Sequence, residues 1–236
     1  MRRRSGTEPR RREGRAAKAG EGAVALGRPL PRSFYRRSAL VLARDVLGRP
    51  LVCDSPRGRV AGIIVETEAY RGRHDPASHA YRGPTPRARV MFGPPGHAYV
   101  YYIYGAHHCL NLVAEPEGQA AAVLVRALAP VMGVELMRRR RGVRAWEALA
   151  RGPGNLARAL GLTRAHDGAD LTVGPVWLGD RRPQRFGCPT ARGPRVGIRR
   201  AAGRPWRFFL AGHPCVSGPR GAGRPAGRAS SRLTPP

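Results

Sequence analysis

The residues best suited to chemistry lie at the end of an apolar run that begins at Gly62 and ends at Tyr70. The run predicts a β-strand, and side chains two positions apart on a strand share a face, about 7 Å from one another. Glu66, Glu68 and Tyr70 should therefore line one side of it. A carboxylate beside an aromatic ring at a strand end suits a general base next to a flat substrate. Two carboxylates on an exposed strand edge would give the same pattern, so both interpretations stay open.

A second segment, from Ala98 to Gly105, is rich in tyrosine. We expect a strand that ends in a tight turn at Gly105, so that Tyr104 projects from the tip of a β-hairpin. A ring on such a tip can enter a base stack and fill the gap left by a flipped nucleotide. Tyr101 lies deeper in the strand and is better placed to stack on a base in a pocket. Core packing is the competing interpretation for the other tyrosines of the segment.

The loop after the Gly62–Tyr70 strand carries further polar groups. His79 could hydrogen-bond the edge of a substrate, and Thr85 and Arg87 offer phosphate contacts. The dipeptide His107-His108 makes a poor chelate, because neighbouring residues on a strand point to opposite faces. The four cysteines lack metal-ligand spacing and are expected to be packing thiols. We therefore expect neither a metal nor a cofactor.

The remaining pattern predicts the elements that position these residues. Helices are expected over 39–47, with Ser38 as N-cap and Gly48 just past the end, over 130–141 and over 155–160. Runs of strands joined by short turns favour an α+β fold: a single domain with a mostly antiparallel, curved β-sheet flanked by helices, and a protruding β-hairpin. The expected strands are 50–53, 60–70, 98–104, 109–114, 120–128, 173–178, 195–199 and 207–210.

Charge points to the class of partner. The 236 residues carry a formal net charge of +28. Basic side chains on phosphates release condensed counterions, so nucleic acid is the expected partner. The basic residues are almost all arginine in a chain rich in Ala, Gly and Pro, a bias that a GC-rich genome also produces. Charge alone therefore does not decide the function.

Composition also sets the domain boundaries. Residues 1–28 and 219–236 have few large apolar side chains and cannot bury enough surface to offset their ordering entropy. We expect both to be disordered tails around a folded domain over 29–218. No stretch reaches the roughly 20 apolar residues of a membrane span, and the charged N-terminus lacks the apolar core of a secretory signal. A cytoplasmic protein without membrane contact is expected.

Together these segments resemble the alkyladenine DNA glycosylase family, also called 3-methyladenine or N-methylpurine DNA glycosylases. The matches occur in the family's order across 29–218, and ten colinear matches are far more specific than any one of them. The matching stretches are 65–70, 75–79, 85–87, 91–93, 99–105, 109–111, 125–128, 152–153, 195–197 and 205–209.

The resemblance implies an enzyme of base excision repair. It would flip an alkylated or deaminated purine out of double-stranded DNA and hydrolyse the N-glycosidic bond with an activated water, leaving an abasic site. Glu68 would be the general base that deprotonates the water. Arg126 and the backbone carbonyl of Val196 would hold that water in place.

The resemblance also implies where the substrate binds. Tyr70, His79 and Tyr101 would enclose the flipped purine, and Asn111 would gate the pocket by disfavouring the exocyclic amino group of guanine. A monomer is expected, acting on DNA in the cytoplasm of a bacterium and associated with the nucleoid. The residues expected to contact DNA are Thr85, Arg87, Met91 and Tyr104, with Tyr104 intercalating at the hairpin tip.

The lysine content bears on the mechanism independently of the resemblance. A glycosylase with lyase activity uses an amine to form a Schiff base. The only lysine of the chain is Lys18, which lies in the expected N-terminal tail, and the terminal amine is the one exception that stays open. We therefore expect a monofunctional enzyme that uses water and has no lyase activity.

Four positions depart from the family pattern. Pro84 stands where family members often carry a basic residue, and Ala88 stands where many have Asn. Ala106 replaces a larger apolar residue, and Asn155 replaces a common Lys. These departures bear on DNA affinity or lesion range rather than on the reaction.

Two other functions compete with this interpretation. A non-catalytic RNA- or ribosome-binding protein would need only the charge and the tyrosines. A metal-dependent nuclease could use Glu66, Glu68, Asp75 and His79 as ligands, and EDTA would inhibit it.

Overall fold

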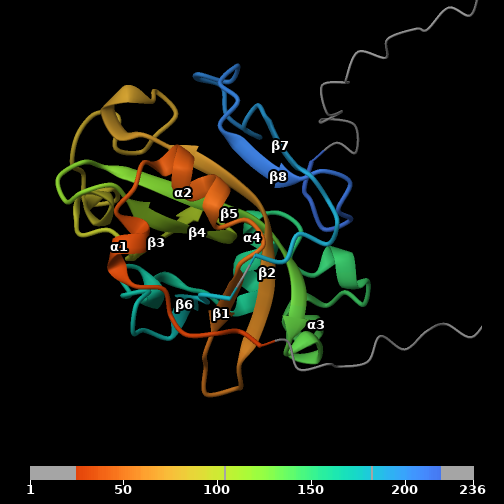
Figure 1. The fold of residues 1–236 in the computed structure, drawn as a ribbon. Helices are drawn as coiled ribbons and strands as arrows, with labels where there is room; N and C mark the ends of the chain where they lie inside the picture. Colours follow the sequence, from red (N-terminus) through yellow and green to blue (C-terminus); the bar gives the residue numbers. More distant parts are fainter. Residues whose placement is uncertain (1–24, 104, 182, 219–236) are drawn as a thin grey trace, which may run out of the picture.

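The computed structural model describes residues 25–103, 105–181 and 183–218. Its strands form an eight-stranded sheet in the order β3-β4-β5-β2-β1-β6, with β8 also paired to β2 and β7 paired to β8. All of these pairings are antiparallel, and the sheet curls around a core, so the predicted α+β fold is confirmed (Figure 1). The elements are α1 (Arg32–Tyr35), α2 (Ala39–Asp45), β1 (Pro50–Cys53), β2 (Val60–Tyr70), β3 (Ala98–Ile103), β4 (His107–Ala114), β5 (Ala121–Met132), α3 (Val134–Arg141), α4 (Pro153–Leu160), β6 (Val176–Leu178), β7 (Thr190–Gly193) and β8 (Arg207–Leu210).

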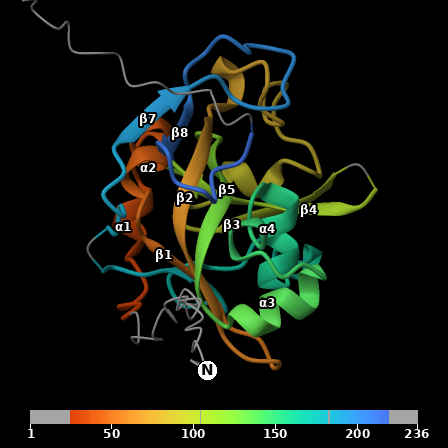
Figure 2. The ribbon, with the colours of Figure 1, turned by 90° about the vertical axis from the view of Figure 1, so that its right-hand side faces the viewer.

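Strands β2 and β5 form the centre of the molecule. Figure 2 shows them between α2 on one side and α4 on the other; α2 contacts both strands, and α4 contacts β5. β2 is buried along its length up to the half-buried Tyr70, because it pairs with β1, β5 and β8. Glu66 and Glu68 are therefore fully buried, and the interpretation that they lie on an exposed strand edge is wrong.

Side chains alternate along β2, and the alternation separates a structural face from a polar face. Thr67 points toward α2, where its hydroxyl donates to the carbonyl of Ala43 at 2.7 Å. Glu66 and Glu68 point to the other side, toward Arg126 on β5. The pairing of β2 with β5 shifts register on both sides of Glu66, as a β-bulge does. The irregularity lies where the two carboxylates have to be accommodated.

The helix over 39–47 is confirmed in its main part. It runs over Ala39–Asp45, and the Ser38 side chain accepts a hydrogen bond from the Val41 N–H at 3.3 Å, which makes Ser38 the predicted N-cap. The next predicted helix begins late. β5 continues through Met132, and α3 starts only after Gly133, whose φ of 67° breaks the strand. The helix expected from 155 begins at Pro153.

One predicted strand is wrong and one strand was missed. Residues 195–199 form a loop, whereas β7 lies just before them, over Thr190–Gly193. β7 pairs only with β8 and is half exposed, so it lacks the apolar alternation that identifies a strand. The 195–199 loop is held in place by side-chain contacts with β2 and with the loop that follows β2. Such long-range contacts leave no local pattern in the sequence.

The domain also begins earlier than predicted. Leu26 is buried in a small cluster with Val52, Ala61 and Trp177. The carbonyl of Arg28 accepts a hydrogen bond from the N–H of Asp180 at 2.9 Å. Residues 25–28 therefore belong to the folded part of the chain. The other residues assigned to tails, 1–24 and 219–236, lie outside the described residues.

Candidate active site

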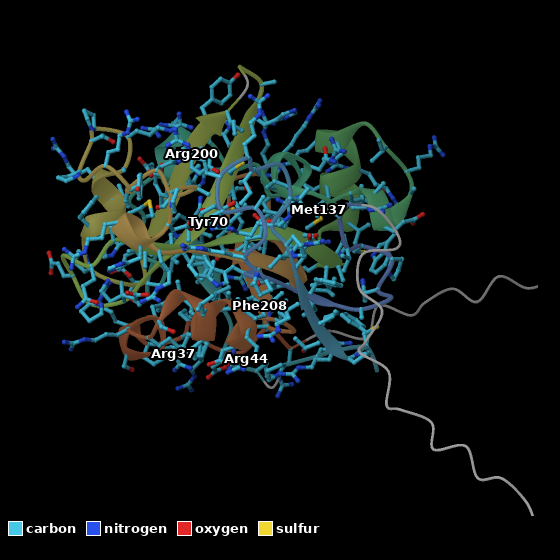
Figure 3. All side chains as sticks on the ribbon, turned by 90° about the horizontal axis from the view of Figure 1, so that it is seen from above. Arg37, Arg44, Tyr70, Met137, Arg200 and Phe208 are labelled. Atoms are coloured by element: carbon cyan, nitrogen blue, oxygen red, sulfur yellow. The ribbon has the colours of Figure 1, made fainter. Side chains whose placement is uncertain are left out.

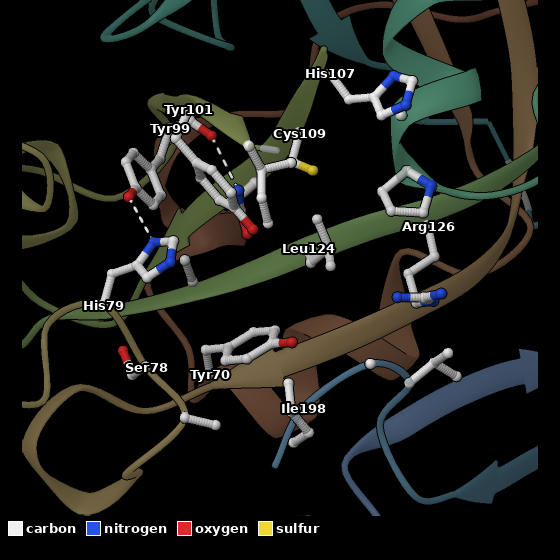
Figure 4. A pocket seen from close by; sticks show the side chains of 18 of the residues that line it. Tyr70, Ser78, His79, Tyr99, Tyr101, His107, Cys109, Leu124, Arg126 and Ile198 are labelled. Atoms are coloured by element: carbon white, nitrogen blue, oxygen red, sulfur yellow. Dashed lines mark hydrogen bonds between the residues drawn. The ribbon is translucent and has the colours of Figure 1, made fainter. Parts of the chain in front are cut away.

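A cavity of about 410 Å³ opens between β2 and the β3–β4 hairpin. Its volume lies in the range of sites for small molecules. Figure 4 shows Tyr70 on one side of the cavity, with Tyr101 and His79 on the other and Leu124 behind them. The cavity therefore has two aromatic walls, and Arg126 lies at one end of it (Figure 4), while Val196 is also part of the lining.

Glu68 lies one layer below the cavity surface. Its Oε1 accepts a hydrogen bond from the Val196 N–H at 2.7 Å and lies 3.3 Å from Nη1 of Arg126. Its Oε2 accepts a hydrogen bond from the Tyr70 hydroxyl at 2.8 Å. Glu68 is not itself among the residues that line the cavity, but these three partners are. A water at this end of the cavity can contact the carboxylate only if Tyr70, Arg126 or Val196 moves aside.

Burial raises the pKa of Glu68 above its usual range, because a charged carboxylate loses its solvation there. The positive charge of Arg126 and the hydrogen bonds from Val196 and Tyr70 oppose this effect. Burial and the neighbouring groups thus act on the pKa of Glu68 in opposite directions, a situation that is common for a catalytic base.

Arg126 belongs to a buried network of charges. Its Nε donates to Oε1 of Glu66 at 3.1 Å, and the same oxygen accepts from Nε of Arg207 at 2.6 Å. The side chains of Glu66, Arg126 and Arg207 are at most 8% exposed. Two carboxylates and two guanidinium groups therefore balance one another without solvent.

The imidazole of His79 is fixed by Tyr99. Its Nδ1 shares a hydrogen bond of 2.9 Å with the Tyr99 hydroxyl, which leaves Nε2 available to a ligand. The ring meets Tyr101 edge to face, with centroids 4.6 Å apart and an angle of 77° between the planes. His79 and Tyr101 thus form one composite wall opposite Tyr70, rather than two separate layers of a stack. Tyr99, for which core packing was the competing interpretation, is buried and also lines the cavity.

The surroundings set the protonation state of His79. Desolvation by the cavity wall and the nearby charge of Arg87 lower the pKa of His79 to about 4, although part of the residue is exposed. The ring is therefore neutral near pH 7 and can exchange hydrogen bonds with a base without adding a positive charge.

Asn111 and Met91 both line the cavity from buried positions. Nδ2 of Asn111 donates to the carbonyl of Tyr99 across the β3–β4 pair at 3.1 Å, so its amide orientation is fixed. Met91 is only 2% exposed and packs with Tyr99. That Met91 contacts DNA stays a prediction, and its buried side chain faces the cavity rather than the outer surface.

A second buried ion pair supports the wall that carries Tyr70. The guanidinium of Arg195 binds both carboxylate oxygens of Asp75, at 2.5 and 2.8 Å, and donates to the carbonyl of Ala69 at 2.9 Å. It also lies 4.6 Å from the centroid of the Tyr70 ring and 5.1 Å from that of Trp206. Arg195 thus holds the ring from behind and fixes the loop whose next residue, Val196, binds Glu68. The sequence analysis assigned no role to Arg195.

Comparison with known proteins decides the family. The model of the methylpurine-DNA glycosylase family matches residues 33–214. The chain belongs to this family. Relatives from Rhodopseudomonas palustris strain BisB18, Methanocella arvoryzae and Frankia casuarinae are each 50% identical, over 198, 195 and 202 residues. The matches cover 84%, 80% and 81% of this chain, and 94%, 95% and 93% of the relatives, which bear the name "Putative 3-methyladenine DNA glycosylase".

In this member of the methylpurine-DNA glycosylase family, the residues expected to contact DNA differ in their exposure and in whether the structure describes them. Thr85 and Arg87 are exposed, and the guanidinium of Arg87 lies 5.0 Å from the centroid of the ring of Tyr101, which lines the cavity. Tyr104 lies outside the described residues, between the last paired residues of the hairpin, Ile103 and His107. The hairpin protrudes from the body of the molecule beyond α4 (Figure 2).

The carboxylates that a metal-dependent nuclease would need are already occupied by arginines. Glu66 binds two of them, and Asp75 is held on both oxygens by Arg195. Among the described residues, no three His, Cys, Asp or Glu side chains are grouped to hold a metal ion. The geometry therefore disfavours the nuclease interpretation.

Two further observations concern the cysteines and the helices. All four cysteines are free, and burial raises the pKa of Cys53 to about 11 and that of Cys215 to about 12, as expected for packing thiols. Across the part of the chain that the structure describes, no helix has the length and apolarity needed to cross a bilayer.

The Asp75–Arg195 pair gives a prediction on stability. Asp75→Asn removes the charge that faces a buried guanidinium, and breaking such a pair costs about 3–5 kcal/mol. Urea unfolding should report this loss as a lower free energy of unfolding. Glu135→Gln is the matched control, because Glu135 pairs with Arg138 on the surface of α3, where such a pair contributes about 1 kcal/mol or less. Equal losses in the two variants would contradict the supporting role of Asp75.

Proposed function

We propose that the protein is a monofunctional DNA glycosylase that hydrolyses the N-glycosidic bond of an alkylated or deaminated purine flipped out of duplex DNA. The observation that carries the proposal is the buried Glu68 carboxylate, held by Tyr70, Arg126 and the Val196 N–H at one end of a cavity with aromatic walls. Membership of the methylpurine-DNA glycosylase family supports the same reaction.

The chemistry follows from the position of Glu68. A water held by Arg126 and the Val196 carbonyl gives a proton to Glu68 as its oxygen attacks C1′ of the deoxyribose. The N-glycosidic bond breaks, and its electron pair leaves with the purine. An alkylated purine carries a positive charge and departs as a neutral base, whereas a neutral lesion also requires a proton on the leaving group. The 3.3 Å contact between Arg126 and Glu68 is the longest around the carboxylate, and we propose that the water binds beside it.

Recognition of the base falls to the cavity walls. The purine stacks between Tyr70 and the wall formed by Tyr101 and His79, with Nε2 of His79 toward its edge. Asn111, buried and fixed in orientation, narrows the cavity against the exocyclic amino group of guanine. Stacking on aromatic rings tolerates different purines, which fits a range of lesions.

Catalysis by water rather than by an amine is supported by the lysine content. The only lysine of the 236 residues is Lys18, far from the site in sequence and outside the residues that the structure describes. A Schiff base with the sugar needs a reactive amine. The product is therefore an intact abasic site.

DNA binding relies on arginine. The chain carries a net charge of +28, and nitrogen-bearing side chains surround the molecule in Figure 3. We assign phosphate contacts beside the flipped nucleotide to the exposed side chains of Thr85 and Arg87, of which Arg87 lies over the ring of Tyr101. We assign the wedge that fills the vacated stack to Tyr104 at the hairpin tip. An RNA- or ribosome-binding protein would share the charge but would have no use for the buried base.

The proposal is tested by a single-turnover assay in EDTA on duplexes that carry one hypoxanthine or one ethenoadenine, beside release of methylpurines from methylated DNA. Strand cleavage at the lesion only after alkali, or released methylpurine, is the expected result. Cleavage without alkali would contradict a monofunctional enzyme, and no release from any substrate by a folded, DNA-binding protein would overturn the proposal.

Glu68→Gln should abolish excision while lesion binding is kept, because the amide preserves the size of the side chain but cannot accept the proton. In the wild type, the rate should fall as the pH decreases through the raised pKa of Glu68, since only the ionised form is a base. Single-turnover rates and binding to lesion duplexes measure the two effects separately. Activity of Glu68→Gln near that of the wild type would remove Glu68 as the base.

Arg87→Ala should weaken binding to undamaged duplex and reduce the slope of log affinity against log salt by about 1. Arg44→Ala is the matched control, because Arg44 is equally exposed but lies on the side of the molecule away from the hairpin (Figure 3). Fluorescence anisotropy over a salt series measures both. The same change in slope for the two variants would indicate diffuse attraction rather than a defined contact at Arg87.

Tyr104→Ala should weaken lesion binding by the loss of stacking, which contributes about 1–3 kcal/mol per base. Tyr104→Phe keeps the ring and should bind like the wild type. A fluorescent base analogue placed opposite the lesion reports flipping directly. Unchanged affinity and flipping in Tyr104→Ala would exclude the wedge role.

A further inference from the structure

The last part of the described chain is anchored behind the active site. Cys215 is fully buried, and its N–H donates to Nδ1 of His213 at 3.2 Å. The carbonyl of Val216 accepts a hydrogen bond from Nε of Arg151 at 2.9 Å. These contacts fix the position of the next residue, Ser217, which is 7% exposed.

All three polar groups of Ser217 bind the buried charge network. Its N–H donates to Oε2 of Glu66 at 2.7 Å, and its carbonyl accepts from Nη2 of Arg207 at 2.7 Å. Its hydroxyl oxygen accepts from Nη2 of Arg126 at 3.1 Å. One residue thus joins the strands β2, β5 and β8 through the side chain that each contributes to the network.

These bonds determine how Arg126 is oriented. Nε binds Glu66 and Nη2 binds Ser217, and two fixed points define the orientation of a planar guanidinium. Nη1 is the nitrogen that remains, and it lies 3.3 Å from Oε1 of Glu68. Without the Ser217 hydroxyl, the group would keep its bond to Glu66 but could turn about it.

We propose that Ser217 is a positioning residue for base excision: its hydroxyl orients Arg126 so that Nη1 faces Glu68 and the cavity. The inference rests on the proposed function, because it assigns to Arg126 a part in the reaction. Ser217 lies beyond residues 33–214, which the family model matches, so the match itself does not assign this residue a role.

The orientation of Arg126 affects when Glu68 can act. The charge of Arg126 lowers the pKa of Glu68 and opposes the effect of burial. The other titratable and charged groups around Arg126 are Glu66 and Tyr70 on β2, Cys109 on β4 and Arg207 on β8. A guanidinium that turns away from Glu68 allows the pKa of this carboxyl to rise further, so the ionised base forms only at higher pH.

The experiment compares Ser217→Ala and Ser217→Cys with Ser217→Thr in the full chain, under single-turnover conditions with saturating enzyme and hypoxanthine duplex. Ala removes the acceptor, Cys keeps a similar volume with a weak acceptor, and Thr keeps the hydroxyl. Both backbone contacts of Ser217 remain in every variant. Loss of one hydrogen bond to a charged group should slow excision in Ala and Cys by about three- to tenfold.

The pH profile separates positioning from general destabilisation. In Ser217→Ala and Ser217→Cys, the acidic limb should move upward by about half a pH unit, with DNA affinity unchanged. Ser217→Thr should restore the wild-type profile. Thr67→Val is the matched control, because it removes a buried hydroxyl that bonds to Ala43 on the opposite face of β2. It should lower the melting temperature without moving the limb.

The outcomes distinguish this inference from the function on which it rests. A wild-type chain that releases no base overturns both. If the wild type is active but Ser217→Ala has the same pH profile, the positioning role alone is overturned. The same holds if Thr67→Val moves the acidic limb as far as Ser217→Ala does.

Discussion

Two carboxylates without solvent contact, Glu66 and Glu68, lie side by side on the central strand, and much of the structure around them serves to balance their charge. Removing a charged carboxylate from water costs several kcal/mol unless opposite charges and hydrogen bonds replace the lost solvation. Arg126 and Arg207 supply the charges, and backbone N–H groups from Val196 and Ser217 supply bonds. The fold therefore has to bring β5, β8, the 194–206 loop and the chain after β8 together around β2. The candidate catalytic site and the long-range architecture are consequences of the same requirement.

The two carboxylates are held in different ways. Glu66 has both oxygens taken by close donors between 2.6 and 3.1 Å and serves as a fixed anchor for two arginines. Glu68 has one short backbone bond, one bond to a tyrosine hydroxyl that lines the cavity, and a looser contact with Arg126. Only the second arrangement leaves a proton acceptor that a small movement can make accessible. The two neighbouring carboxylates thus differ in the number of their hydrogen-bond donors and in the distances to them.

The sequence predicted much of this fold because local patterns carry the information. The bounds of β1, β2 and β8, the cap at Ser38 and the α+β class follow from alternation and capping residues, and the residues predicted around a base pocket do lie around one cavity. The pairs Asp75–Arg195 and Glu66–Arg207 join residues more than 100 positions apart, and no spacing rule reports them. Arg126 could be singled out because it interrupts an apolar strand. Ser217 lies in a segment of Gly, Pro and Ser, where nothing indicates burial, and Arg195 lies in a segment taken for a strand.

Glu68 lies beneath the cavity surface rather than in its lining, and Tyr70, Arg126 and Val196 are the residues that belong both to the lining and to the surroundings of Glu68. The surface a base would touch comes largely from β3, β4 and β5, through side chains such as Tyr101, Asn111 and Leu124. The carboxylates and their partners come from β2, β8 and the segments near the C-terminus, together with Arg126 of β5. Substitutions of Tyr101, Asn111 or Leu124 would reshape the cavity at positions that make none of the hydrogen bonds or ion pairs to Glu66 and Glu68. Under the proposed function, a chain built in this way can diversify the set of bases it accepts while the buried network of Glu66, Glu68 and their arginines is inherited unchanged.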